Sequence, residues 1–346
     1  MMNIREQQII DFVKKKGKSS SKEIFDALDI SVSYATLKRA LTKLISEKYL
    51  STEGQGKGTT YSLSPVYEVI QPVDIEHYYQ KEIDEREIKS GFNFSVITDV
   101  LANHTVFTEP EVSRLEKLQE IFAINISQLS DNEYKREFER LAIDLSWKSS
   151  QIEGNTYSLL ETERLLREKE TAAGKTKEEA MMLLNHKDAL DFIIGNPDYL
   201  DPLAVSKIED IHTLLVKDLD VERNVRNRRI GISGTNYRPL DNQFQLEEAL
   251  QTACSVINHK KSVFEKALLA LVLLSYIQPF MDGNKRTARI VSNAILMQAK
   301  HCPLSFRTVD SIEYKKAMLL FYEQNNLSAM KEIFMNQFEF AVKTYF

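Results

Sequence analysis

The residues of this chain that are best suited to chemistry lie between Ile277 and Arg289. This stretch reads I-Q-P-F-M-D-G-N-K-R-T-A-R and directly follows the apolar run 267–274. A buried helix that ends in the turn Gly283–Asn284, before a second helix, directs backbone N–H groups at one point. The carboxylate of Asp282 stands beside this turn and could hold a divalent metal that bridges phosphates. The stretch therefore predicts a site for nucleotide phosphates, with three cations close by: Lys285, Arg286 and Arg289.

The same stretch resembles the signature of the Fic family, which reads H-x-F-x-(D/E)-G-N-(G/K)-R-x-x-R. Seven signature positions match at fixed spacing, which makes the signal strong. They are Phe280, Asp282, Gly283, Asn284, Lys285, Arg286 and Arg289. Gln278 stands where the family has its catalytic histidine. The alternative interpretation is an ordinary corner between two helices with a polar surface.

A second segment, S-S-Q-I-E-G-N from Ser149 to Asn155, resembles the inhibitory helix of this family, (S/T)-x-x-x-E-(G/N). Ser149 and Glu153 are four residues apart, so they share one face of a helix. Gly154 is a natural residue for ending that helix. The resemblance implies that Glu153 reaches Arg289 and occupies the space that the γ-phosphate of a nucleotide needs.

A third segment, Ile230 to Leu240, is interrupted by glycines and predicts a small β-hairpin or an extended flap. It resembles the flap on which the family positions its target, where a protein segment pairs with the flap backbone as an added strand. The neighbouring Arg226, Arg228 and Arg229 are interpreted as solvated charges. The flap residues are Ile230, Gly231, Ile232, Ser233, Gly234, Thr235 and Tyr237.

The resemblance implies transfer of AMP from ATP to a Ser, Thr or Tyr hydroxyl of a protein, either an unknown target or the chain itself. Asp282 would bind Mg²⁺, and Phe280 would fix the loop by packing. Gly283, Asn284 and Lys285 would cradle the phosphates, and Arg286 and Arg289 would hold the β- and γ-phosphates. A phosphotransferase, as in the Doc-like branch, is a rival, but that branch has an altered turn at Asp282–Gly283.

Gln278 departs from the family pattern at the position that matters for rate. A glutamine amide is not a useful base near neutral pH, whereas imidazole has an unperturbed pKa of about 6.5. Losing the general base should lower the rate by roughly 10²- to 10⁴-fold. The chain is expected to bind ATP or ADP with Mg²⁺ and to transfer AMP slowly or not at all. Gln278 belongs either to a natural pseudoenzyme or to a deliberate replacement. Removal of AMP from a modified protein, with Glu153 positioning water, is an alternative role.

The first 65 residues predict a winged helix-turn-helix domain. Helices are expected at Ile4–Lys16, after Ser19–Ser21 and from about Ser33 to Lys48, with strands at Tyr49–Glu53 and Thr59–Leu63. This pattern resembles bacterial regulators, in which the third helix enters the DNA major groove. Residues 1–65 hold 11 Lys and Arg and 7 Asp and Glu, a net charge of +4 within a chain of −5. The candidate DNA contacts are Thr36, Arg39, Lys43 and Lys57.

The remainder of the chain predicts a mainly α protein. Residues 66–91 are expected to be a linker with a helix at Tyr78–Lys89, and residues 92–346 a Fic-like helical domain with the flap hairpin. In that domain the inhibitory helix spans about 140–155 and the core about 205–300. Helices are expected at 109–122, 133–151, 159–169, 176–194, 205–216, 246–258, 263–278, 284–298 and 311–325.

Composition narrows the class of protein further. With 346 residues and 43% hydrophobic content, the chain can bury a sizeable core and form two domains. No apolar run approaches the length of a membrane helix, and Cys254 and Cys302 have no metal-ligand spacing. These features predict a cytoplasmic protein, with a homo-oligomer left open. Two further rivals are a nucleotide-sensing DNA-binding regulator and a purely structural helical scaffold.

Overall fold

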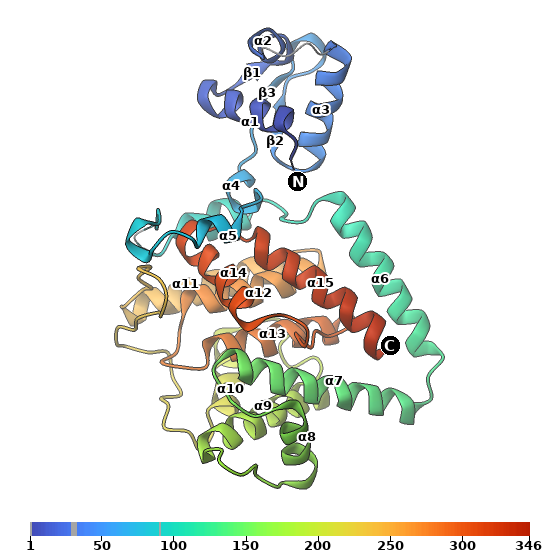
Figure 1. Ribbon diagram of the computed structural model, residues 1–346, viewed down its shortest axis with the longest axis vertical. Helices are drawn as coiled ribbons and strands as arrows, with labels where there is room; N and C mark the ends of the chain where they lie inside the picture. Colours follow the sequence, from blue (N-terminus) through green and yellow to red (C-terminus); the bar gives the residue numbers. More distant parts are fainter. Residues whose placement is uncertain (1, 29–32, 90) are drawn as a thin grey trace.

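The computed structural model describes residues 2–28, 33–89 and 91–346, without the side chain of Lys57. Lys57, one of the candidate DNA contacts, therefore has its side chain outside the described part. The structure is mainly α-helical, as the sequence predicts. A small N-terminal unit stands above a larger helical body, to which it is joined by a segment containing α4 and α5 (Figure 1).

The N-terminal unit combines three helices with one antiparallel sheet. The helices are α1 (Ile4–Lys16), α2 (Ser21–Ala27) and α3 (Tyr34–Ser46), and the strands are β1 (Ser19–Ser20), β2 (Leu50–Glu53) and β3 (Thr60–Leu63). The sheet order is β1-β3-β2. Capping boxes begin α1, at Asn3 and Glu6, and α2, at Ser20 and Glu23. Ile9, Ile24, Leu37, Leu41 and Leu44 fill the core of the unit. This arrangement confirms the expected winged helix.

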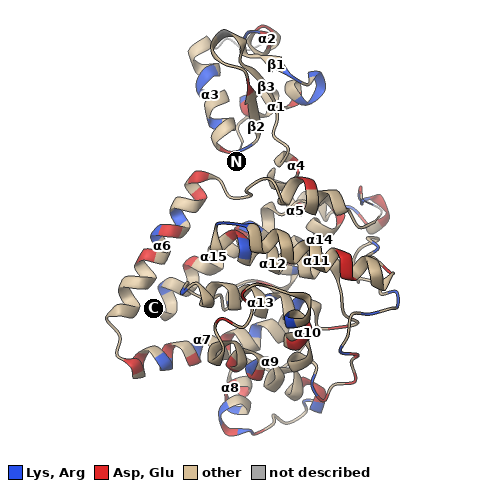
Figure 2. Cartoon of the chain, turned by 180° about the vertical axis from the view of Figure 1, so that it is seen from behind, with Lys and Arg blue, Asp and Glu red and all other residues tan. Residues whose placement is uncertain are grey.

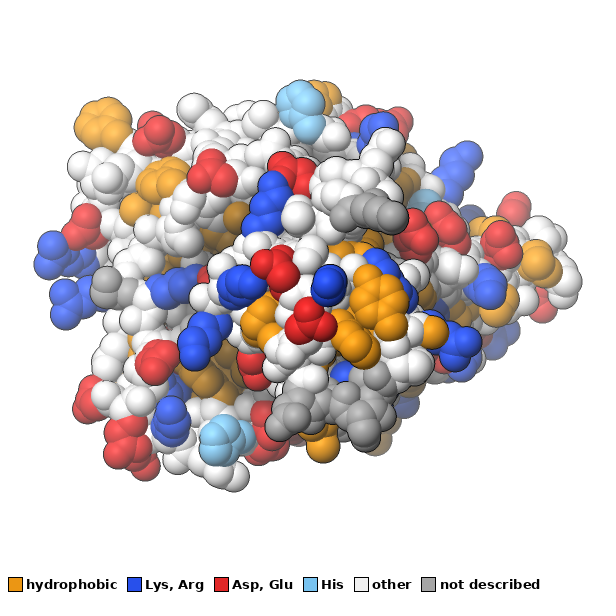
Figure 3. Space-filling view, turned by 90° about the horizontal axis from the view of Figure 1, so that it is seen from above, with side chains coloured by type: hydrophobic (Ala, Val, Ile, Leu, Met, Phe, Trp, Pro, Cys, Tyr) orange, Lys and Arg blue, Asp and Glu red, His pale blue; other side chains and the backbone are white. Residues whose placement is uncertain are grey.

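Charge on the N-terminal unit is mixed. Lys and Arg positions recur along α3 (Figure 2), and on the upper face of the molecule basic side chains alternate with Asp and Glu (Figure 3). Lys43 is paired with the buried Glu6 at 2.7 Å and lies 3.7 Å from Glu47, so much of its charge is balanced inside the unit. Arg39 is exposed and forms no ion pair within the described residues. Arg39 is therefore the most available cation among the candidate DNA contacts of α3.

The segment that follows β3 differs from its prediction. It forms α4 (Tyr67–Ile70) and α5 (Ile75–Tyr78), and the helix predicted at 78–89 is wrong, because only a 3₁₀ turn at Ile83–Glu85 occurs there. The side chains of this segment reach across to a helix of the body instead of forming a solvated helical face. Tyr78 donates a hydrogen bond to Glu323, and Tyr79 donates one to the carbonyl of Lys316. These contacts hold the segment extended.

The body is built around one antiparallel helix pair, α12 and α13. Every predicted helix of the body is present, and α13 begins and ends at the predicted residues. The helix 328–345 was not predicted, although Phe334, Phe338, Ala341 and Val342 follow a helical repeat. The helices are α6 (Glu109–Ser127), α7 (Asp131–Ile152), α8 (Leu159–Glu168), α9 (Lys177–Gly195), α10 (Val205–Leu215), α11 (Gln243–His259), α12 (Val263–Ile277), α13 (Asn284–Gln298), α14 (Ser311–Gln324) and α15 (Ser328–Tyr345).

Burial explains why α12 and α13 form a rigid centre. Almost every side chain of α12 is buried, as expected from its nearly unbroken apolar sequence. Helices α7, α9, α10, α11, α14 and α15 pack around the pair. Within the described residues no helix combines the length and hydropathy needed to cross a membrane. Both cysteines are buried and free.

Candidate active site

The turn between α12 and α13 depends on two residues in the left-handed backbone region. Gln278 has φ 53° at the end of α12, and Gly283 has φ 80° at the start of α13. A Cβ at Gly283 would also lie 3.4 Å from the imidazole of His212, so glycine satisfies both the backbone and the neighbour. The first N–H groups of α13 have no partners within the helix, and they carry its positive dipole end.

A closed set of hydrogen bonds gives the turn its shape. The amide nitrogen of Asn284 donates to Gln278 Oε1 at 3.0 Å and to the Phe280 carbonyl at 2.8 Å, while its oxygen accepts from the Phe280 N–H. Gln278 Nε2 donates to the Ser275 carbonyl and to the Tyr322 hydroxyl. The Asn284 side chain is therefore used inside the turn, and its backbone N–H is what it can offer to a ligand.

His212 of α10 supports the same turn from below. Its ring stacks on Phe280 with centroids 3.7 Å apart, and Nε2 lies 3.0 Å from the Asp282 carbonyl oxygen. Burial lowers the pKa of His212, which favours the neutral ring. Sequence analysis did not single out His212, because a lone histidine on a helix carries no spacing signal.

Glu153 lies directly against the cations of α13. Its carboxylate oxygens are 2.9 Å from Arg289 Nη2 and 3.0 Å from Lys285 Nζ. The buried Arg289 also donates to the Ser149 hydroxyl and to the Ser149 carbonyl. The resemblance implied the contact with Arg289, whereas the contact with Lys285 was not foreseen. Both cations of this group are thus engaged by the end of α7.

The charge state of Glu153 follows from these neighbours. Burial raises its pKa, but the charges of Arg289 and Lys285 outweigh burial and lower the pKa to about 2. Since the pKa in the folded state is below the unfolded value, the stabilisation is complete above about pH 4.5 and is lost only as the pH falls toward 2. Glu153 therefore remains ionised throughout the neutral range.

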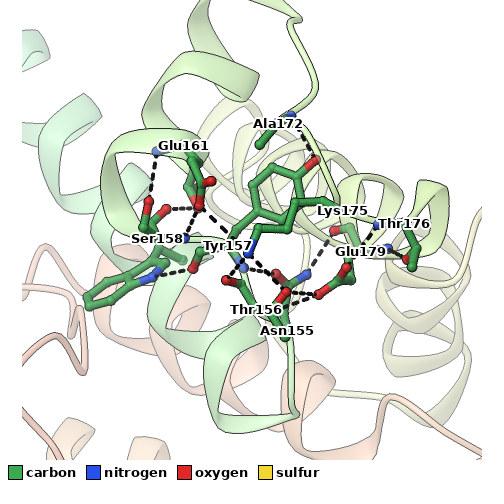
Figure 4. Close-up of polar contacts among 11 residues, drawn as sticks. Asn155, Thr156, Tyr157, Ser158, Glu161, Ala172, Lys175, Thr176 and Glu179 are labelled. Atoms are coloured by element: carbon green, nitrogen blue, oxygen red, sulfur yellow. Dashed lines mark hydrogen bonds and ion pairs between the residues drawn. The ribbon is translucent and has the colours of Figure 1, made fainter.

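The loop after Glu153 is anchored to α9 (Figure 4). Asn155 Nδ2 donates to the Glu179 carbonyl at 2.8 Å, and the Thr156 N–H donates to the Glu179 carboxylate at 2.8 Å. Lys175 donates to the Thr156 carbonyl at 2.6 Å. Gly154, with φ 101°, makes the bend that leads from α7 into this loop. The anchored loop leaves Glu153 little freedom to withdraw from α13.

A cavity of about 320 Å³ opens in front of the turn. It is lined by Glu153, by Lys315 and Tyr322 of α14, and by the flap residues Ile230, Gly231, Ile232 and Ser233. The turn contributes Gln278, Asp282, Gly283, Asn284 and Lys285 to the lining. Of the other predicted residues, Ser149, Arg286 and Arg289 are buried and do not line the cavity, and Tyr237 is buried against Tyr276.

The flap is not a β-hairpin. Residues 224–242 contain a turn at 233–234 but no paired strands, so the predicted hairpin is wrong and the extended alternative is the one observed. The guanidinium of Arg226 instead bonds to carbonyls at both ends of the flap. It donates to Arg228 and Leu240 carbonyls at 2.6 Å and to the Gln278 carbonyl at 2.7 Å.

The interpretation of Arg226 as a solvated charge is therefore wrong, because its side chain is only 1% exposed. Arg228 and Arg229 are exposed and pair with Glu222 and Asp241. The local sequence gave no signal that separates the buried Arg226 from the exposed Arg228 and Arg229. Arg226 joins both ends of the flap to the turn that carries Gln278.

The residues present fit a bound polyphosphate. Arg286 donates to Asp282 at 3.0 Å, but its buried Nε and Nη1, like Nη1 of Arg289, find no hydrogen-bond partner among the described residues. The Asp282 side chain is 65% exposed and can turn toward a ligand. Among the described residues no three His, Cys, Asp or Glu side chains form a metal-binding group. A magnesium ion here would be shared between Asp282 and the phosphates, which is common for this ion.

Comparison with known proteins decides the family of this site. Residues 202–296 match the model of the Fic/DOC family. The chain carries a Fic/DOC domain. The matched segment runs from the start of α10 to near the end of α13, and so contains the flap, the turn and Arg289. Residues 3–118 match the penicillinase repressor model, and this match covers the whole N-terminal unit.

Curated relatives of this chain are named protein adenylyltransferases. The one from Nematostella vectensis is 27% identical over 215 residues, 58% of this chain and 47% of the relative. The one from Culex quinquefasciatus is 25% identical over 67% of this chain and 47% of the relative. The chain spans about a third to a half of the length of the curated relatives it matches.

Solved structures show the same fold at low sequence identity. A Fic-1 structure from Caenorhabditis elegans superposes with a TM-score of 0.61 at 19% identity, over 68% of this chain and 72% of that one. A Fic family protein from Desulfovibrio desulfuricans gives 0.59 at 19% identity, over 69% and 74%.

Proposed function

We propose that this chain is a Fic-type protein adenylyltransferase that Glu153 holds in an inhibited state and that Gln278 makes slow. The observation that carries the proposal is the position of Glu153, which bridges Lys285 and Arg289 at the edge of the cavity. A carboxylate that neutralises two cations of an anion site competes with the phosphates that would bind there. The names of the relatives support the reaction class.

Each part of the site has a role in this proposal. The N–H groups at the start of α13 and the side chain of Lys285 bind phosphate oxygens, and Arg286 and Arg289 stabilise charge on the outer phosphates. Asp282 would hold Mg²⁺, which would supply positive charge to neutralise the phosphates. The open backbone at 230–234 binds a segment of the target as an added strand, so that its hydroxyl faces the α-phosphorus.

Gln278 supplies no base for this attack. Its amide nitrogen donates two hydrogen bonds, and its oxygen accepts from Asn284, so the side chain is a structural part of the turn. The proton of the attacking hydroxyl has no acceptor of useful basicity at this position. We infer that nucleotide binding is retained and that transfer is slow.

Titration calorimetry tests the binding half of the proposal. Mg·ADP and Mg·ATP should each give measurable heat with the Glu153→Gly variant, and binding to the parent chain should be weaker by at least about tenfold. Adding Lys285→Gln to Glu153→Gly should weaken binding again, whereas adding Lys135→Gln, at the far end of α7, should change nothing. Absence of heat with both nucleotides after Glu153 is removed would refute the proposal.

Removal of AMP from a modified protein, with Glu153 holding the water, is the alternative role of this residue. Both oxygens of Glu153 are engaged by cations, which supports inhibition over activation of water.

We also propose that the chain divides into a winged-helix domain at 1–65, a linker at 66–91 and a Fic-like domain at 92–346.

A second candidate function is DNA binding by the N-terminal unit. The match of residues 3–118 to the penicillinase repressor model and the exposed Arg39 on α3 support it. Under this alternative, the protein is a DNA-binding regulator, and its Fic-like body serves as a nucleotide sensor.

Salt dependence tests DNA binding. With about three phosphate contacts, affinity for duplex DNA should fall roughly 40-fold between about 50 and about 200 mM salt. Arg39→Ala should reduce the slope of log affinity against log salt by about one, while Lys117→Ala on α6 should leave it unchanged. Affinity that is undetectable at the lower salt, or insensitive to Arg39→Ala, would exclude α3 as the contact.

A further inference from the structure

The tip of the flap is held by a buried arginine from outside the Fic/DOC match. Arg86 lies in the segment between the N-terminal unit and the body, and its side chain is 3% exposed. Its Nη2 donates to the carbonyl of Gly234, at the flap turn, at 2.8 Å. Its Nη1 donates to Glu323 of α14 at 3.0 Å. One guanidinium therefore joins the linker, the flap and the wall of the cavity.

Glu323 is built into this arrangement as a fully buried carboxylate. It accepts from Arg86 and from the Tyr78 hydroxyl, while its backbone carbonyl accepts from the Lys89 N–H at 2.8 Å. Tyr79 packs its ring against the Arg86 guanidinium, with 5.0 Å between Cζ and the ring centroid. A buried ion pair that is further hydrogen-bonded holds its geometry closely, because any displacement leaves a desolvated charge without a partner.

Besides Tyr237, which is buried and stacks on Tyr276, few contacts among the described residues hold the flap in this position. It contains no paired strands, and Arg226 secures only its two ends, at Arg228 and Leu240. At the turn, Gly234 has φ 89° and a Cβ would lie 3.4 Å from Leu319, a residue that lines the cavity. Asn236 adds one exposed hydrogen bond to Asp84, also in the linker. Both contacts from outside the body thus come from the linker.

We propose that Arg86 is a positioning residue that sets the flap for a target segment, and that the linker is therefore part of the target-binding machinery. The inference rests on the proposed function in so far as the flap binds a protein strand. A strand added at 230–234 needs the flap backbone at a defined distance from the turn that carries Gln278. Arg226 defines that distance at the flap ends, and Arg86 defines it at the tip.

A nitroxide on the flap tests the inference without any need for catalysis. Both native cysteines are buried, so a Ser233→Cys substitution in the full chain provides a selectively reactive thiol. Arg86→Lys keeps a charge beside Glu323, but a single ammonium cannot reproduce the guanidinium's separate bonds to Glu323 and to the Gly234 carbonyl. We expect Arg86→Lys to shorten the rotational correlation time of the label by about twofold or more.

The matched control is Lys316→Gln, which removes an ion pair between α14 and Glu76 of the linker without touching the flap. It should leave the label unchanged. Equal spectra for Arg86→Lys, Lys316→Gln and the parent would overturn the inference. If Arg86→Lys does not fold, the double variant Arg86→Gln with Glu323→Gln keeps a neutral, hydrogen-bonded pair in the same volume and should show the same gain in mobility.

A second measurement separates this inference from the proposed function. In a chain carrying Gln278→His and Glu153→Gly, adding Arg86→Lys should lower the rate of AMP transfer from ATP. The affinity for Mg·ADP should stay within about twofold of the value for the chain without Arg86→Lys. A loss of Mg·ADP affinity equal to the loss of rate would make Arg86 a general structural residue and overturn the inference. If the chain carrying Glu153→Gly binds no Mg·ADP, the proposed function fails, and the nitroxide result still decides the role of Arg86.

Discussion

Replacing Gln278 by His in a chain that also carries Glu153→Gly should raise the rate of AMP transfer by about 10²- to 10⁴-fold over Glu153→Gly alone. The cavity, the free N–H groups at the start of α13 and the cations proposed to bind phosphate are already in place around this position. Imidazole would add the one missing element, a base that accepts the proton of the attacking hydroxyl. Intact-mass measurement of the chain with Mg·ATP, together with pyrophosphate release, reports the rate.

The pH dependence of the same variant gives a second criterion. Only the neutral ring accepts a proton, so the rate should rise with pH through about 6.5 and then level off. Gln278→Asn is the control, because it changes the packing of the turn and supplies no base. Equal rates for the His and Asn variants, at full nucleotide occupancy, would show that position 278 does not limit transfer.

Replacing Glu153 by Gly in the Gln278→His background should raise the rate of AMP transfer by about 10- to 100-fold. Its carboxylate makes charged hydrogen bonds to Lys285 and Arg289, and each such contact contributes about 1.5–3 kcal/mol that a phosphate must replace. Glu153→Gly frees both cations, and Glu153→Gln should have an intermediate effect because its amide still contacts Arg289. Initial rates at one Mg·ATP concentration well below saturation measure the difference, because competition with the phosphates is overcome at saturation.

Two controls define this second result. Glu139→Gln alters an exposed charge earlier on α7 and should not change the rate. The inhibition by Glu153 should also be constant between about pH 5 and pH 8, because its pKa of about 2 keeps it ionised there. An unchanged rate in Glu153→Gly would mean that Glu153 does not restrain the site.

Local patterns in the sequence predicted most of the helical framework. Helix α13 begins after Gly283 and ends at Gln298. Both bounds could be predicted, because the glycine that allows φ 80° and the helix-forming residues after it are visible in the local sequence. The four-residue spacing from Ser149 to Glu153 likewise places both on one helix face. Resemblance to the Fic signature added the expected contact between Glu153 and Arg289.

Long-range polar contacts were beyond such patterns. Nothing in the order N-V-R-N-R-R distinguishes the buried Arg226 from its exposed neighbours, and nothing near Arg86 points to Glu323, more than two hundred residues away. The helix predicted at 78–89 failed for the same reason, since Tyr78, Tyr79 and Arg86 gain more from contacts with α14 than from helical hydrogen bonds.

The amino-acid sequence by itself determined which elements form and which residue types stand at the turn between α12 and α13, since caps, glycines and hydrophobic periodicity act over a few residues. Only the tertiary structure decided which partner each charged side chain finds. Glu153 pairs with Lys285, Arg226 bonds to the carbonyls at the flap ends, and Arg86 bonds to the carbonyl of Gly234. Those partners come from segments distant in the chain, and desolvation makes their pairing strongly dependent on geometry.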